Sequence, residues 1–203
     1  FFERAEIKDT LAYLRLLANR QDDAAFERAV NTPTRGIGQR TVEHLRAQSQ
    51  KHNQSLWESA LGAIQDATLN GRAKSALLGF VELIDALARE TQHTLLSNQI
   101  DFVLKQSGLY AHYAEASRGT LDARTDNLDE LVTVASRFAQ VAIEEGAEPL
   151  PELVGFLAYA ALEAGEAQAE AWEDCVQLMT LHSAKGLEFP LVCMVGVGEG
   201  LFP

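Results

Sequence analysis

The chain has 203 residues, of which 47% are hydrophobic, and a formal net charge of −12. This length and composition are sufficient for a buried core in one or two domains, and no run approaches the roughly 18 apolar residues that a membrane-spanning helix needs. The acidic balance argues against a surface that coats nucleic acid non-specifically.

The charge is distributed unevenly along the chain. Residues 1–51 hold nine Lys and Arg against seven Asp and Glu, whereas residues 52–203 hold eight against twenty-two, and no Lys or Arg lies between Phe138 and Ala184. Contact with a polyanion is therefore expected in the N-terminal quarter or at Lys185. The alternative is that the acidic surface serves only solubility.

The cysteines, the histidines and the two chain ends each narrow the range of proteins to which this sequence can belong. Cys175 and Cys193 lie in apolar segments without a disulfide framework, which predicts a reducing cytoplasm. The five histidines show no metal-ligand spacing with cysteine or carboxylate, so no zinc site is expected. The chain starts without methionine and stops just after an apolar run, and we expect a segment of a larger protein.

Most of the chain has the periodicity of amphipathic helices. The first, at 6–19, places Ile7, Leu11, Leu14 and Leu17 or Ala18 on one face. Further helices are predicted at 22–30, at 39–51 with Val42 and Leu45 inward, from a capping box at Ser55 and Glu58 onward, at 71–90, at 95–107 before a C-cap at Gly108, at 127–143 and at 152–165.

The periodicity changes near the C-terminus. Residues 175–182 and 191–197 are short, apolar and β-leaning, and the second is a continuous run typical of a strand buried on both faces. The fold class predicted is mainly α, with a small α/β piece. The turn-rich stretch 144–151 is interpreted as a linker.

A glycine-rich loop separates the second and third predicted helices. Glycines permit positive φ and leave the backbone open to a phosphate, which the N–H groups at the start of the next helix would bind. Ile37 would anchor this hairpin while basic side chains add charge, and such a site carries no sequence information. The other interpretation is a simple turn. The candidate residues are Thr34, Arg35, Gly36, Ile37, Gly38, Arg40 and Thr41.

A second candidate site is the stretch "TLHSAKGLEFP", residues 180–190. It follows a predicted strand, and ligands of open α/β sheets bind beyond the carboxyl ends of strands. Its Ala-Lys-Gly order is not that of a phosphate-binding P-loop. Thr180 and His182 can donate to a phosphate, Lys185 supplies charge, and Glu188 can accept from a sugar hydroxyl. On spacing alone, a strand-to-helix turn with a solvated lysine is favoured.

Two further features have structural interpretations. Asp129 and Glu130 lie on a predicted amphipathic helix, where a solvated acidic face is favoured over a magnesium site. Trp57 and Trp172 fall at helical spacing and are expected in the core rather than as stacking platforms for bases.

Four segments together resemble the UvrD/Rep/PcrA family of superfamily 1 DNA helicases. They are residues 1–17, 31–41, 176–192 and 199–203, in the same order and spacing as in that family. Residues 180–190 match its motif V over their full length. One departure is that Gly198 stands where the family commonly has the first of two acids.

The resemblance implies a segment of the second RecA-like motor domain with its helical insertion, called 2B. The implied boundaries are 1–20 for a motor remnant, 21–174 for the 2B subdomain with a helix-hairpin-helix-like loop, and 175–203 for a motor remnant with motif V. It implies that Thr34 to Thr41 contact duplex DNA, and that Thr180, His182 and Ser183 contact single-stranded DNA. Gly186 and Glu188 would lie near the nucleotide, with Glu188 toward the ribose, and Lys185 would lie between the two sites, so that this segment couples the nucleotide to DNA.

The implied parent is a bacterial, cytoplasmic and nucleoid-associated 3′-to-5′ helicase of DNA repair that hydrolyses ATP with Mg²⁺. This chain lacks the P-loop pattern, so we expect no ATPase activity from it alone. The implied partners are DNA at a single-strand/duplex junction and repair proteins. A competing hypothesis is a regulatory or protein-interaction helical module with little DNA affinity, which the acidic surface favours. A small-molecule kinase fails for want of a phosphate loop.

Overall fold

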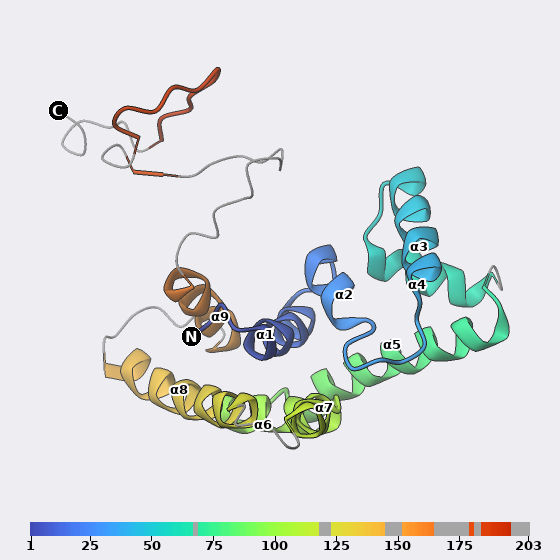
Figure 1. Ribbon diagram of the computed structural model, residues 1–203, viewed down its shortest axis with the longest axis horizontal. Coiled ribbons are helices and arrows are strands. Elements are labelled where there is room, and N and C mark those ends of the chain that lie inside the picture. Colours follow the sequence, from blue (N-terminus) through green and yellow to red (C-terminus); the bar gives the residue numbers. More distant parts are fainter. Residues whose placement is uncertain (67–68, 118–122, 145–151, 165–178, 181–183, 196–203) are drawn as a thin grey trace. The chain divides into compact units, whose positions relative to one another are not determined.

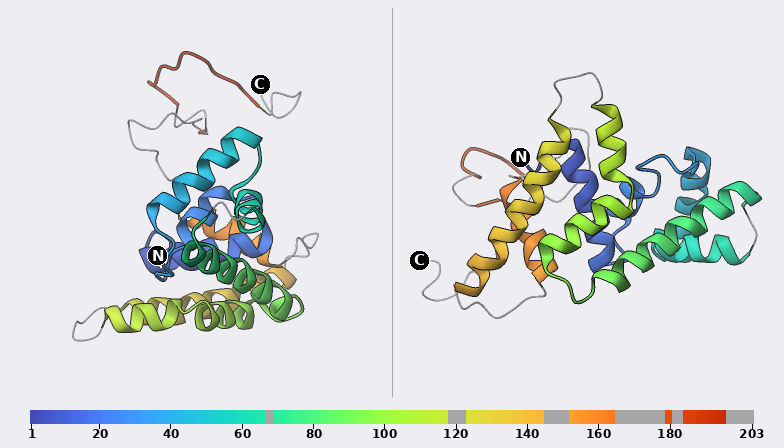
Figure 2. Two further views of the ribbon diagram at one scale, coloured as in Figure 1. Left: turned by 90° about the vertical axis from the view of Figure 1, so that its right-hand side faces the viewer. Right: turned by 90° about the horizontal axis from the view of Figure 1, so that it is seen from below.

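The computed structural model describes residues 1–66, 69–117, 123–144, 152–164, 179–180 and 184–195. The chain divides into two units, 1–166 and 167–203. The described part of the first is helical, as Figures 1 and 2 show. Its helices are α1 (Ala5–Ala18), α2 (Asp23–Ala29), α3 (Gln39–His52), α4 (Leu56–Gln65), α5 (Gly71–Thr91), α6 (Leu96–Gln106), α7 (Leu109–Ala116), α8 (Arg124–Glu144) and α9 (Glu152–Glu163).

Polar side chains at the helix ends set several of these boundaries. The Asp22 carboxylate accepts from the Ala25 N–H at 2.9 Å and caps α2. Ser55 and Glu58 form the predicted capping box of α4. Gly108 has φ +82°, which lets the chain leave α6 and enter α7 at once. The short helix α7 was not predicted, and this immediate restart is the reason.

Helix α1 is the centre of the first unit. It contacts α2, α5, α6, α7, α8 and α9, and in Figure 1 it lies among them rather than at an edge. Ile7, Leu11 and Leu14 are buried, which confirms the predicted inward face, but Ala18 is exposed and Leu16 is buried. A helix surrounded by six others has little solvent face, so an amphipathic pattern underestimates its burial.

Aromatic residues form two clusters in the core. Tyr13, Phe26, Trp57 and Phe80 meet edge to face, with ring centroids 5.7 to 6.5 Å apart. Phe2, Phe138, Phe156 and Tyr159 join the N-terminus to α8 and α9. Trp57 is thus a core residue as predicted, and Asp129 and Glu130 are exposed as predicted. Trp172 lies outside the described residues.

The mainly helical fold is confirmed, but the strand expected at 191–197 is wrong for the part that the structure describes. Residues 191–195 form no strand, and Leu191, Val192, Met194 and Val195 are exposed. A strand is stabilised by hydrogen bonds to a neighbour, and among the described residues of this unit the backbone bonds are those of one turn. Of the other predicted strand, only Met179 and Thr180 are described, and neither is in a strand.

Candidate nucleic-acid interface

The loop between α2 and α3 presents bare backbone at two glycines. Gly36 has φ +83°, a conformation that favours glycine, whereas Gly38 has φ −81° and ψ 169°, which any residue adopts. A Cβ atom built on either glycine would meet nothing within 4 Å. A side chain would therefore fit at both positions, and only Gly36 has a backbone conformation that favours glycine.

The outer face of this loop offers hydrogen-bond donors. Gly38 is the N-cap of α3, and its carbonyl accepts from the N–H groups of Thr41 and Val42. Within the described chain, no partner accepts from the N–H groups of Gly38, Gln39 and Arg40. Free N–H groups at the start of a 14-residue helix attract an anion. The exposed residues here are Thr34, Gly36, Gly38, Gln39 and Arg40, and Thr41 is half-buried.

The inner face of the loop is held by the core. Ile37 is 1% exposed and packs in the core, as the sequence predicted for a hairpin anchor. The Asn31 side-chain oxygen accepts from the N–H groups of Arg35, at 2.8 Å, and Ile37, at 3.2 Å. Arg35 is half-buried and its guanidinium bonds to carbonyl oxygens on the inner side of the loop, whereas Arg40 is exposed.

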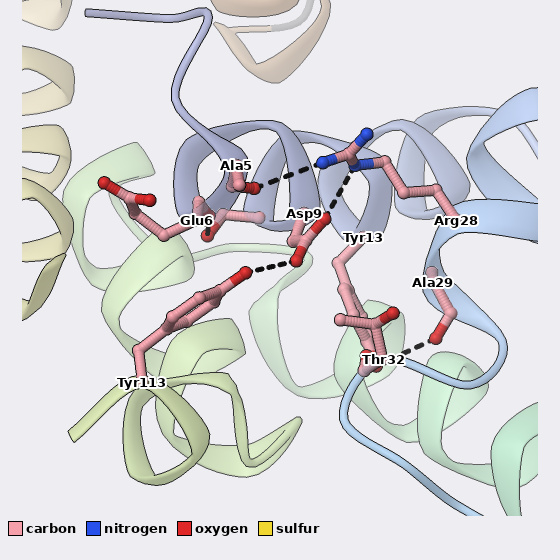
Figure 3. Close-up of polar contacts among 9 residues, drawn as sticks. Ala5, Glu6, Asp9, Tyr13, Arg28, Ala29, Thr32 and Tyr113 are labelled. Atoms are coloured by element: carbon pink, nitrogen blue, oxygen red, sulfur yellow. Dashed lines mark hydrogen bonds and ion pairs between the residues drawn. The ribbon is translucent and has the colours of Figure 1, made fainter. Parts of the chain in front are cut away.

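Tyr13 reaches the loop from α1. Its hydroxyl donates to the carbonyl oxygens of Thr32, at 2.6 Å, and Ala29, at 3.3 Å, as Figure 3 shows. Burial favours the neutral phenol and raises the pKa of Tyr13 to about 12, although the nearby Arg35 charge acts in the opposite direction. Tyr13 therefore remains a donor throughout the neutral pH range.

A polar cluster with a buried carboxylate, Asp9, and an exposed arginine, Arg28, joins α1 to α2 and α7. The Asp9 carboxylate pairs with the Arg28 Nε at 2.7 Å and accepts a hydrogen bond from the Tyr113 hydroxyl (Figure 3). Arg28 also donates to the Ala5 carbonyl at 3.3 Å. Burial, followed by the bond to Asp9, raises the pKa of Tyr113. These contacts fix the helix from which Tyr13 projects.

Sequence reasoning missed this cluster. Asp9 and Glu6 are 7% and 5% exposed, respectively, although a three-residue spacing on an amphipathic helix favours a solvated face. The Glu6 carboxylate accepts from the Asn127 amide at 2.7 Å. The local sequence gives no signal for this burial, because the partners Tyr113 and Asn127 lie more than 100 residues from Asp9 and Glu6 along the chain.

The second candidate site lies in the unit 167–203. Residues 184–187 form a turn in which the Ala184 N–H donates to the Thr180 carbonyl and the Leu187 N–H donates to the Ala184 carbonyl, both at 3.0 Å. Gly186 has φ +86°. Thr180, Lys185, Gly186 and Glu188 are exposed. His182 and Ser183 lie outside the described residues.

Comparison with known proteins identifies a family that covers the whole chain. A family model described as the UvrD-like helicase C-terminal domain matches residues 1–203. The chain belongs to the UvrD-like helicase C-terminal domain family. The family-level resemblance drawn from the motifs is thereby confirmed.

Several curated relatives of this UvrD-like helicase C-terminal domain are DNA helicases. DNA helicase II of Escherichia coli (strain K12) is 55% identical over 203 residues, and that of Haemophilus influenzae is 54% identical over the same length. ATP-dependent DNA helicase PcrA of Leuconostoc citreum is 37% identical over 204 residues. Each match covers 100% of this chain but only 27–28% of the relative.

The described residues contain no group of three or more His, Cys, Asp or Glu side chains placed to hold a metal ion. None of their helices is both long and apolar enough to cross a bilayer.

Proposed function

We propose that this UvrD-like helicase C-terminal domain is the segment of an ATP-dependent 3′-to-5′ DNA helicase that contacts the duplex backbone. The contact is assigned to the hairpin of residues 31–41, which corresponds to the helix-hairpin-helix-like loop of a 2B subdomain. Thr34, Gly36, Gly38, Arg40 and Thr41 lie toward the DNA, and Ile37 anchors the loop.

The observation that carries this proposal is the bare backbone at Gly38. Neither conformation nor packing calls for glycine there, yet the position stands directly before the free N–H groups of α3. A phosphate oxygen approaching those groups would be obstructed by a side chain at this point. Binding of this kind recognises the backbone and not the base sequence.

The exposed turn of the second unit is assigned to coupling, as motif V. Thr180, His182 and Ser183 would contact the phosphate of single-stranded DNA, while Lys185, Gly186 and Glu188 would lie toward the nucleotide. The Lys185 ammonium and the bare backbone at Gly186 suit contact with a phosphate, and the Glu188 carboxylate suits contact with a ribose hydroxyl. These three groups do not form a complete nucleotide pocket. ATP and Mg²⁺ would therefore be bound largely by the rest of the parent helicase.

The parent is proposed to act in DNA repair, in a bacterial cytoplasm and in association with the nucleoid, with repair proteins as further partners. The isolated 203-residue chain is expected to lack ATPase activity because it has no P-loop sequence. Steady, Mg²⁺-dependent ATP turnover by the pure chain would contradict this expectation.

A second candidate function is a regulatory or protein-interaction module with little DNA affinity. The observation that favours it is the net charge of −12, which weakens attraction to a polyanion. Under this function the hairpin would be an ordinary loop and substitutions on its outer face would leave duplex affinity unchanged.

A charge placed at Gly38 distinguishes the two functions. Aspartate is a preferred N-cap residue, so Gly38→Asp should preserve or strengthen α3 while it repels phosphate. The matched control is Gly71→Asp, which puts the same charge at the start of α5, where a Cβ also meets nothing within 4 Å. Fluorescence anisotropy with a labelled duplex carrying a 3′ tail would measure both affinities.

We expect Gly38→Asp to weaken duplex binding by about tenfold or more, and Gly71→Asp to change it by less than about threefold. Circular dichroism checks that both variants keep their helices. Equal affinities for the wild type and the two variants, or no binding by a folded wild type at low salt, would favour the regulatory module.

A further inference from the structure

The Arg35 guanidinium joins three segments of the first unit from the inner side of the hairpin. It donates to the carbonyl oxygens of Ala29, at 3.2 Å, Pro33, at 3.0 Å, and Ser107, at 2.9 Å. These carbonyls belong to the end of α2, to the loop itself and to the turn between α6 and α7. One side chain thus connects the hairpin to segments on both sides of it in the sequence.

The same guanidinium is enclosed by aromatic rings. Its Cζ atom lies 5.6 Å from the ring centroid of Tyr13 and 5.6 Å from that of Phe80. Cation–π contacts of a partly desolvated guanidinium add to its hydrogen bonds. To contact a phosphate, Arg35 would have to leave three carbonyl acceptors and two rings, and the Pro33 and Ser107 carbonyls would lose the donor that it supplies.

Other side chains hold the loop from the same direction. Asn31 accepts from two loop N–H groups, and the Tyr13 hydroxyl donates to the Thr32 carbonyl. Every one of these partners is a backbone group. The contacts therefore fix the course of the loop backbone itself, which carries the donors that face outward at Gly38, Gln39 and Arg40.

A fixed backbone matters because the proposed phosphate site consists of backbone groups. Ordering one residue costs about 1–2 kcal/mol in conformational entropy. A loop that is ordered before binding avoids this cost at the moment of association. In a disordered loop the same cost would reduce the net free energy of binding.

We propose that Arg35 is a positioning residue for duplex contact: it holds the hairpin in its DNA-binding shape from beneath and does not touch the phosphate. This inference rests on the proposed function of the hairpin. It departs from the direct phosphate role that the sequence pattern assigned to Arg35.

The test compares Arg35→Lys and Arg35→Gln with Arg20→Gln in the 203-residue chain. Arg20 is a matched control because its guanidinium also donates to carbonyl oxygens, those of Leu16 and Ile84, and lies 5.0 Å from the ring centroid of Trp57. None of these partners belongs to the hairpin. Duplex affinity is measured by anisotropy over a range of salt concentrations, and amide exchange of Arg35 or its replacement and of Ile37 reports on loop order.

A positioning role predicts three results. Both Arg35 variants lose about tenfold or more in duplex affinity, with an unchanged slope of log K against log salt. Lysine does not restore affinity, because a single ammonium cannot reproduce the fork that reaches three carbonyls. The two amides exchange about tenfold faster or more, while Arg20→Gln leaves affinity and loop exchange unchanged.

Other outcomes overturn the proposal in distinguishable ways. A slope reduced by about 0.9 in Arg35→Gln, with affinity restored by lysine, would make Arg35 a phosphate contact and leave the proposed function standing. Faster exchange without loss of affinity, or an equal loss in Arg20→Gln, would reduce Arg35 to a structural residue. A folded wild type that does not bind the duplex would instead overturn the proposed function.

Should Arg35→Gln fail to fold, Tyr13→Phe provides a milder test. It keeps the ring beneath the guanidinium and removes only the hydroxyl that donates to the Thr32 carbonyl. A loss of about two- to fivefold in affinity at unchanged salt slope supports positioning from the inner side. Unchanged affinity in a variant with faster loop exchange contradicts it.

Discussion

The hairpin of residues 31–41 and the turn of residues 184–187 each contain one glycine at positive φ, but their surroundings are opposite. Gly36 and Gly186 have φ values of +83° and +86°, and a Cβ on either would meet nothing within 4 Å. The hairpin is anchored by Ile37 and by bonds from Tyr13, Asn31 and Arg35. The turn is followed by exposed residues as far as Val195.

The difference shows that a glycine turn does not by itself make a rigid binding site. The hairpin backbone is fixed because Ile37 enters the core and because Asn31 and Arg35 bond to its backbone groups. The backbone hydrogen bonds of the turn, among the described residues, are the two within it. A site of backbone N–H groups depends on the residues behind it as much as on its glycines.

The largest expected effect is the loss of stability when a buried apolar side chain of the hairpin is truncated, compared with an exposed one near the turn. Ile37→Ala should lower the free energy of unfolding by about 2–5 kcal/mol, because it removes a fully buried side chain and leaves a cavity. Leu191→Ala, at a position that is 82% exposed, should change it by less than about 0.5 kcal/mol. Urea unfolding followed by far-UV circular dichroism measures both. Similar values for the two variants would show that the hairpin is no better anchored than the second unit.

Alkali should loosen the hairpin through Tyr13. Its folded pKa of about 12 exceeds the ordinary value of 10, so below pH 10 both states keep the proton and the full contribution is present. Between pH 10 and 12 the unfolded state loses its proton first, and stability falls by up to about 3 kcal/mol.

The pH effect can be assigned by comparing the wild type with Tyr13→Phe. All four tyrosines lie within residues 1–166, so tyrosinate absorbance follows that unit alone. The variant should be about 1 kcal/mol less stable at neutral pH, because the Thr32 carbonyl loses a donor, and should weaken less between pH 10 and 12. Parallel stability curves for the two proteins above pH 10 would contradict a raised Tyr13 pKa.

The smallest expected effect comes from the same substitution at the two matched glycines. Alanine at positive φ is strained by about 1–2 kcal/mol, partly offset by a less flexible unfolded chain. Gly36→Ala should therefore destabilise the helical unit by about 1 kcal/mol, whereas Gly186→Ala should leave its unfolding transition unchanged. A shift of that transition by Gly186→Ala would mean that the two units unfold together.

Much of the helical fold could be predicted from the sequence, because periodicity and capping are local. Val42 and Leu45 face inward, the Ser55–Glu58 capping box forms, and Gly108 ends α6 as expected. The boundaries of the predicted domains stay predictions, although residues 1–18 pack within the first unit.

What could not be predicted depends on contacts between residues far apart in the sequence. Whether Arg35 faces solvent or the Ser107 carbonyl is decided 72 residues away. The burial of Asp9 depends on Tyr113, which lies 104 residues away. A run such as Leu191–Val195 has strand propensity, but a strand forms only where another segment pairs with it. The sequence pattern contains none of these pairings.

The central place of α1 has a consequence for synthesis of the chain. This helix is synthesised before all six of its partners, and roughly 130 residues separate its end from the start of α9, one of those partners. At about 5–20 residues per second, it waits about 7–27 s for its last neighbour. Before those partners are made, water can solvate the charged groups of Glu6, Lys8 and Asp9. The two acids become buried only when α2, α7 and α8 pack against α1.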